Sequence, residues 1–164
     1  KMAVLGVDDF KAKLRGGGAR PNLFKATINY PGYAGGDVEV TSFLCETAQL
    51  PGSTFGTIIV PFRGRQLKMA GDRTFAPWTV TIINDTDFSL RDAFEKWNAA
   101  PVLYEADLFV EQLDRSGETV KKYDIRGAFP TDLSPIDVSY TATDEIERFT
   151  CTFEFQYFET NTTT

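Results

Sequence analysis

The chain has 164 residues, of which 42% are apolar, with a net charge of −6, two cysteines and no histidine. This length predicts one domain with a sizeable core. The acidic balance argues against binding nucleic acid through phosphate contacts, which need clustered Lys and Arg side chains. The absence of histidine excludes Ser-His-Asp and Cys-His nucleophile systems and argues against a structural zinc site.

The first segment, residues 1–22, is predicted to be an N-terminal arm. It lacks the apolar stretch of a signal peptide. Residues 7–14 predict a short helix with Phe10 and Leu14 on one face, ended by the glycines at 16–18. The arm carries too little apolar surface to fold alone, so we expect it to become ordered by docking on another surface.

After the arm, apolar residues alternate with polar ones in segment after segment, which is typical of half-buried strands. Prolines 130 and 135 are expected to bracket a loop, and Arg63-Gly64 to form a turn. The predicted strands cover residues 24–30, 38–47, 57–62, 65–70, 78–83, 104–111, 120–128, 136–140 and 149–157.

One helix is predicted over about residues 88–99, capped by Asp87 or Ser89. Its apolar stripe, at helical spacing, is expected to pack on a sheet, and consists of Leu90, Ala93, Phe94 and Trp97. The fold class is therefore mainly β, a β-sandwich or barrel with one flanking α-helix. The β domain is expected over residues 23–159, followed by a frayed tail at 160–164.

The search for chemistry yields no catalytic, cofactor-binding or metal-binding residue. The glycines at 16–18 lack the following Lys-Ser/Thr of a phosphate loop. Cys45 and Cys151 are expected to be buried thiols, although a disulfide between facing strands remains open. No apolar run is long enough for a transmembrane helix, so no membrane insertion is expected.

Three stretches carry a family resemblance: residues 19–24 (ARPNLF), residues 70–85 with AGDRTF, WTVT and ND, and residues 122–146 with FPT and DEI. In this order they resemble the tail tube proteins of T4-like contractile-tailed bacteriophages, over residues from about 19 to 159. The central run is the most specific of the three.

The resemblance implies a structural virion protein and no enzyme. Such proteins form hexameric rings that stack into the tail tube inside a contractile sheath. The implied partners are further copies of the chain, the sheath protein, baseplate or tube-initiator proteins, the tape measure protein, and genomic DNA passing through the lumen without specific binding. The implied location is the phage tail, assembled in the bacterial host cytoplasm. An acidic, polar lumen would repel phosphates and let DNA slide.

Three segments are candidates for contacts between subunits. The turn after residue 70 carries adjacent opposite charges, and the arm carries two apolar anchors. The extended region 47–64 is costly in free energy unless it docks on another surface. The candidate interface residues are Phe10, Leu14, Phe55, Phe62, Asp72 and Arg73.

Alternatives stay open at this point. A tube-initiator or baseplate protein of the same fold, or the tube of a phage-like injection system, fits the same pattern. From another class, a soluble β-sandwich binding module would use Trp78 and Trp97 as ligand platforms. Against that function, both tryptophans fall on the apolar faces of their predicted elements. The polar second faces of the strands meet water in a monomer or line a channel in a ring, and periodicity does not choose between these.

Overall fold

The computed structural model describes residues 6–14, 18–100 and 104–162. Its helices are α1 (Val7–Lys13), α2 (Val38–Leu44) and α3 (Ser89–Asn98). Its strands are β1 (Phe24–Ile28), β2 (Cys45–Ala48), β3 (Ser53–Phe62), β4 (Arg65–Phe75), β5 (Trp78–Ile83), β6 (Ala106–Leu113), β7 (Thr119–Leu133), β8 (Arg148–Glu154) and β9 (Tyr157–Thr160). Within the described ranges, no helix is both long and apolar enough to cross a membrane.

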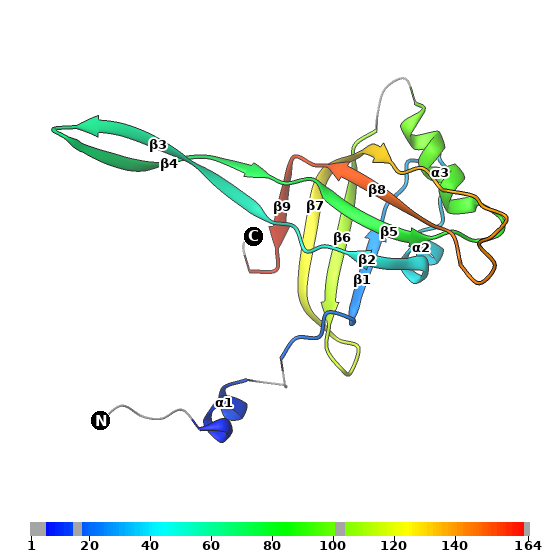
Figure 1. Ribbon diagram of the computed structural model, residues 1–164, viewed down its shortest axis with the longest axis horizontal. Coiled ribbons are helices and arrows are strands. Elements are labelled where there is room, and N and C mark those ends of the chain that lie inside the picture. The colour runs from blue at the N-terminus through cyan, green and yellow to red at the C-terminus, as the bar shows by residue number, and fades with distance from the viewer. Residues whose placement is uncertain (1–5, 15–17, 101–103, 163–164) are drawn as a thin grey trace.

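The strands form one antiparallel sheet in the order β1-β6-β7-β8-β5-β2, and a separate hairpin of β3 and β4 (Figure 1). Strand β7 belongs to both halves of the large sheet: its first part pairs with β6 and β9, and its last part pairs with β8. The two halves enclose one core, as predicted for a sandwich. The path between β1 and β2 does not close, so the alternative of a closed barrel is wrong for the single chain.

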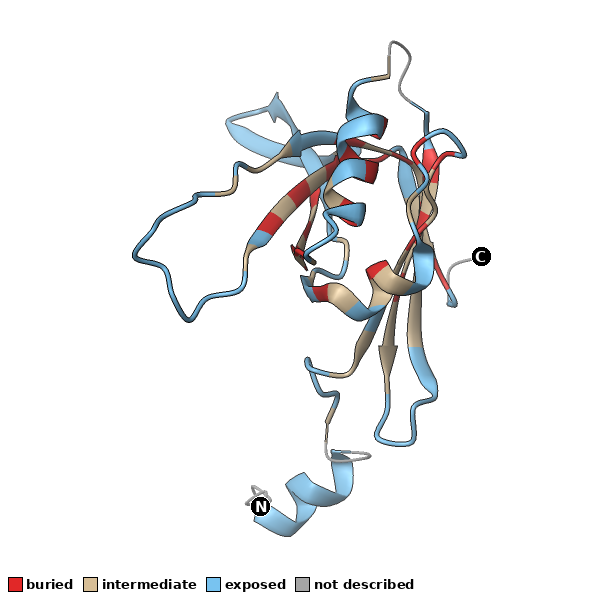
Figure 2. Ribbon diagram, turned by 90° about the vertical axis from the view of Figure 1, so that its right-hand side faces the viewer, coloured by how far each residue is buried: buried red, intermediate tan, exposed pale blue. Residues whose placement is uncertain are grey.

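The core is built from the alternate residues that the periodicity singled out. Trp78, Val80 and Ile82 on β5 are buried, and they lie beside Phe149, Cys151 and Phe153 of the neighbouring strand β8. Figure 2 shows buried residues in the body, whereas α1 is exposed along its whole length. Polar neighbours such as Thr79 and Thr150 fall on the other face, so the alternation reports the two faces of the sheet correctly.

Helix α3 closes this core, which confirms the helix predicted over residues 88–99. The Phe94 ring lies 5.8 Å from Phe149 and 6.0 Å from Phe153, and the Trp97 ring lies 5.7 Å from Phe153. The predicted cap is wrong. Phe88 is the N-cap residue with φ of 55°, while Ser89 donates a hydrogen bond to Asp85 Oδ2 at 3.1 Å.

Both tryptophans are structural. Trp78 and Trp97 expose 1% and 0% of their surface. Each indole N–H donates to a backbone carbonyl, Trp78 to Gln49 at 2.6 Å and Trp97 to Tyr104 at 2.9 Å. A fully buried ring whose polar atom is already bonded cannot stack on an incoming ligand. The binding-module alternative therefore loses its proposed platforms.

The strand predicted over residues 38–47 is wrong in its first part, which forms helix α2. The Asp37 carboxylate caps this helix by accepting from the Glu39 and Val40 N–H groups at 2.9 and 3.2 Å. One helical face then packs Val40 and Leu44 against the core. A side-chain cap and tertiary burial have overridden the strand preference of β-branched residues. Helix α2 is therefore an addition to the two helices that the sequence predicts.

Three further predictions are corrected near the C-terminal end. Strand β7 continues through Pro130 to Leu133, where a loop was expected, with a bulge in its pairing to β8. Residues 136–140, predicted as a strand, contain none. The predicted strand 149–157 is interrupted before Tyr157, because β8 pairs with the last part of β7 whereas residues 157–160 form β9 and pair with an earlier part of it. Thr160 is the last residue of this final strand.

Substituting Phe94→Ala tests the role of α3 as the cover of the core. The change removes a fully buried ring, and we expect it to lower the free energy of unfolding by about 3–5 kcal/mol. Urea unfolding followed by tryptophan fluorescence measures it. Tyr140→Ala, at a fully exposed position, is the control and should stay within about 0.5 kcal/mol of wild type. Equal losses in both variants would contradict the assignment.

The cysteines give a second test. Burial raises the pKa of the Cys45 and Cys151 thiols to about 12, whereas an unfolded cysteine titrates near about 8.5. The folded state therefore favours the neutral thiol, and this stabilisation is complete below the unfolded pKa and fades as pH rises toward 12. We expect both thiols to resist a maleimide reagent at pH 8 in native protein and to react fully in denaturant. Fast native labelling, or none after unfolding without reductant, would contradict two buried free thiols.

Candidate assembly surfaces

The hairpin of β3 and β4 projects from the body, and only its base lies beside other elements (Figure 1). Every residue of β3 is exposed, and so is all of β4 except Gly71 and Phe75, which are partly exposed. Its register confirms the predicted pairing around Arg63-Gly64 and extends it to 10 and 11 residues. A two-stranded hairpin of this kind is at best marginally stable in water on its own.

One face of the hairpin is apolar. Ile58 lies opposite Met69 and Val60 lies opposite Leu67, and directly paired residues share a face. Phe62 follows on the same face by alternation. These five side chains are between 40% and 63% exposed. We call them the hairpin face. The reverse face is more polar and pairs Thr57 with Ala70 and Pro61 with Gln66.

A bulge joins the hairpin to the body. The register slips between Phe55 and Thr57. At this point strands β3 and β4 approach so closely that a Cβ on Gly71 would lie 3.0 Å from the Gly56 carbonyl oxygen. The close approach of the opposite backbone therefore favours glycine at position 71. The bulge increases the local twist, which turns the hairpin out of the sheet.

Asp72 and Arg73, the candidate interface residues predicted on a turn, lie instead within strand β4, and neither forms an ion pair within the described residues. They are adjacent in β4, and successive side chains of a strand point to opposite faces. The Arg73 guanidinium instead lies over aromatic rings, 5.0 Å from Phe75, 5.3 Å from Phe158 and 6.0 Å from Phe55. Arg73 thus ties the base of the hairpin to β9 through cation–π contacts.

The arm carries the other two predicted anchors. The structure confirms a helix at residues 7–13, with Phe10 and Leu14 63% and 42% exposed. The segment after it is held on the end of β6: the Leu113 N–H donates to the Leu23 carbonyl at 2.8 Å, and Gln112 Nε2 donates to the Arg20 carbonyl at 3.3 Å. The arm is therefore attached firmly at its base, while its apolar side chains contact no core.

The polar faces of the large sheet differ in character. On β5 and β8, hydroxyls of facing threonines lie in pairs, with Thr79 Oγ1 3.5 Å from Thr152 and Thr81 Oγ1 3.4 Å from Thr150. On β6, β7 and β9 the face is charged. There Arg126 Nη1 lies 2.7 Å from Asp107 Oδ2, and this hydrogen bond raises the pKa of Arg126. The first face is mostly neutral, and the second is a network of ion pairs.

No cluster of three or more His, Cys, Asp or Glu side chains suited to a metal ion occurs in the described part of the chain. The surfaces that stand out are instead apolar and exposed, namely the hairpin face and the arm. Large exposed apolar surfaces on a folded chain mark sites of protein–protein contact. The geometry is that of an assembly module.

The comparisons with known proteins agree with this geometry. A model of the phage tail tube protein family matches residues 19–102 and 98–161. The chain belongs to the phage tail tube protein family. This confirms the resemblance found in the sequence.

Individual relatives span almost the same length as this chain. It is 32% identical to tail tube protein gp19 of Enterobacteria phage T4, with 93% of this chain and 99% of the relative covered. It is 29% identical to the tail tube protein of Serratia phage KSP90, with 93% and 94% covered. Among solved structures, a chain of the sheath-tube complex of the extracellular contractile injection system PVC has a TM-score of 0.69 at 16% identity, with 92% and 96% covered. The last match shows a shared fold.

The sequence found part of these surfaces. It located the pairing of β3 with β4 and singled out Phe55 and Phe62, but it missed the hairpin face as a unit. The alternation of Ile58, Val60 and Phe62 was the available signal. The sequence predicts an extended region that needs to dock, but a periodic pattern does not say which of its side chains the body leaves uncovered.

The aromatic contacts of Arg73 give a test of the hairpin base. Arg73→Ala removes the guanidinium from the Phe75 and Phe158 rings, and each such contact at an exposed site is worth about 0.5–1 kcal/mol. We expect faster amide hydrogen exchange in residues 53–56 and 72–75, with little change in β8. Arg73→Lys should recover part of the protection, and Lys68→Ala, on the exposed hairpin, should change nothing at the base. Uniform exchange in all three variants would contradict the assigned contacts.

Proposed function

We propose that this chain is the subunit of hexameric rings that stack into a tail tube, through which phage DNA passes at ejection. The observation that carries the proposal is the projecting hairpin with its apolar face. A hairpin of this length loses conformational freedom and exposes apolar side chains in the monomer. Docking on a neighbouring copy buries these apolar side chains and so offsets the entropy cost, and repetition of that contact produces a tube.

The proposed subunit interface includes the residues predicted from the sequence. Phe55 and Phe62 lie at the base and near the tip of β3, and Asp72 and Arg73 lie beside the bulge. Phe10 and Leu14 belong to the arm. The free edges β1 and β2 of the open sheet provide a further means of joining copies, because unpaired strand edges invite pairing with another chain.

The face of β5 and β8 is the proposed wall of the channel. Strand β5 continues from β4 and β2 leads into β3, so this half of the sheet is the one that the hairpin prolongs. Its paired threonine hydroxyls are neutral, and the charged groups of the same face include Glu46, Arg148 and Glu154. Such a surface of hydroxyls with a slight acidic excess has few cationic side chains that could bind the phosphate groups of DNA. DNA therefore slides past without specific binding.

The proposed partners follow from the place of a tube in a contractile tail. The sheath surrounds the tube, consistent with the sheath-tube complex to which the chain is similar in fold. Baseplate or tube-initiator proteins begin its assembly, and the tape measure protein occupies the lumen before DNA. Assembly takes place in the cytoplasm of the bacterial host, and the finished location is the virion tail.

Electron microscopy of the purified protein in a concentration series tests the proposal. Hollow tubes or stacked six-fold rings are expected, alone or after addition of baseplate seeds. The variant Val60→Lys places a charge in the hairpin face and should abolish tubes, because the charge would be buried without a partner. Gln66→Lys, on the reverse face of the same hairpin, is the matched control and should assemble.

Two outcomes would overturn the proposal. Monodisperse monomers at every concentration, with seeds present, would show that the chain does not form tubes. Normal tubes from Val60→Lys would show that the hairpin face is not the contact. Rings that never stack beyond one or two layers would instead favour a tube-initiator of the same fold.

A further inference from the structure

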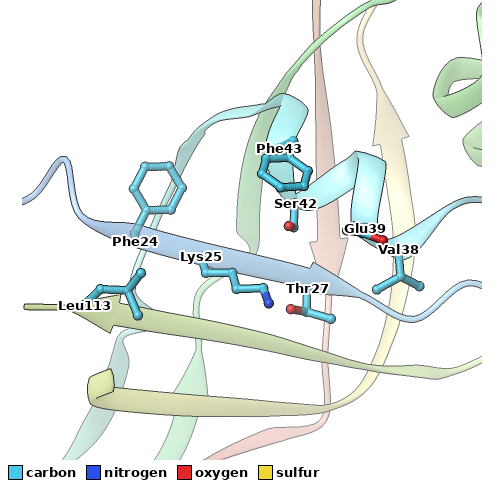
Figure 3. A pocket seen from close by; sticks show the side chains of 8 residues that line it. All are labelled: Phe24, Lys25, Thr27, Val38, Glu39, Ser42, Phe43 and Leu113. Atoms are coloured by element: carbon cyan, nitrogen blue, oxygen red, sulfur yellow. The ribbon is translucent and has the colours of Figure 1, made fainter. Parts of the chain in front are cut away.

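A groove with a volume of about 610 Å³ lies between helix α2 and strand β1 (Figure 3). Phe24, Val38, Phe43 and Leu113 supply its apolar lining, and Lys25 and Glu39 its charges. Phe43 is the most exposed of these, with 79% of its surface exposed on a helix whose other face packs Val40 and Leu44 against the core. A concave, mostly apolar site of this size is suited to a few side chains of a binding partner.

Helix α1 has the complementary form. Val7, Phe10 and Leu14 recur at i, i+3 and i+7, which places them on one face, and they are 71%, 63% and 42% exposed. A helix of seven residues is too short to be stable in water by itself. It therefore needs an apolar surface, and among the described residues its own chain provides none that it contacts.

The charges on the two surfaces also match. The first turn of α1 carries Asp8 and Asp9, and its last turn carries Lys11 and Lys13. The groove offers one cation, on β1, and one anion, in the first turn of α2. Within the described residues, none of these six groups takes part in an ion pair. Docking the helix with its acidic end toward the cation satisfies both pairs and fixes one direction along the groove.

The occupant is a second copy and not the arm of the same chain. The base of the arm is hydrogen-bonded to the end of β6 through the Arg20 and Leu23 carbonyls. In Figure 1, α1 lies apart from the body and away from α2. We propose that α1 of one copy docks in the α2–β1 groove of a neighbouring copy, with Phe10 and Leu14 as the buried anchors. This inference rests on the proposed assembly of copies into a tube.

Cysteine cross-linking tests the docking directly, because both native thiols are buried. Two differently tagged proteins are prepared, one with Phe10→Cys and one with Phe43→Cys, and both positions are exposed, so the substitutions should not impair folding. After mixing under assembly conditions and mild oxidation, we expect a disulfide between the two tags. It should form at least about tenfold faster than with Tyr140→Cys as the second partner, because docking raises the effective concentration.

Equal rates for the Phe43→Cys and Tyr140→Cys partners would overturn the inference. So would a link that forms within one chain carrying both Phe10→Cys and Phe43→Cys at high dilution, since the arm would then occupy its own groove. As a measurement without cysteine, Phe43→Glu should raise the concentration needed for assembly, and Lys25→Glu should do the same and be rescued by Asp9→Lys. Unchanged assembly in Phe43→Glu and Lys25→Glu would also overturn it.

The two proposals fail in different ways. If the wild-type chain forms tubes but the cross-links show no preference, the tube function stands and the docking falls. If no tube forms and the preferred cross-link still appears between copies, the docking stands and the tube function falls. If neither tubes nor the preferred cross-link appear, both proposals fall.

Discussion

The aromatic contact between α3 and β8 holds the two halves of the sheet around one core. Phe94 and Trp97 project from the helix onto Phe149 and Phe153, and the Tyr30 ring reaches the same helix from the other side, 5.3 Å from Phe94. These rings join elements from the beginning, middle and end of the chain. Each of the buried phenylalanine rings contributes roughly 1.5–3 kcal/mol of hydrophobic stabilisation. The body is therefore rigid enough to carry surfaces that do not stabilise it.

Those surfaces are the hairpin and the arm. Each exposes apolar side chains, and each is anchored only at its base, the hairpin by Arg73 over the Phe75 and Phe158 rings and the arm by hydrogen bonds to the end of β6. In a monomer such segments lower the net stability. In an assembly these segments can form contacts between copies, because a rigid base holds each projecting segment in a defined direction. The separation of a stable body from projecting segments is what a repeating tube subunit needs.

The sequence predicted most of the body because its signals are local. Trp78, Val80 and Ile82 alternate, and the Leu90-to-Trp97 stripe recurs at helical spacing, so side-chain periodicity alone identified a strand and a helix. Helix α2 was not predicted, because Val38, Val40 and Phe43 favour a strand by composition. The Asp37 cap and the burial of one helical face stabilise the helix instead. The break before Tyr157 was not predicted, because the sequence alternates across it without interruption. Only the pairing of residues 157–160 with β7 separates the two strands.

By itself, the sequence determined the family, the mainly β class, the helix at 88–99 and the apolar faces, because these depend on neighbouring residues and on motifs in a fixed order. The tertiary structure decided which apolar faces remain uncovered. It placed the hairpin outside the body, set Arg73 over aromatic rings, and opened a groove beside α2. The physical reason is that exposure depends on contacts between residues far apart in the chain, and no local pattern records whether a partner surface is present.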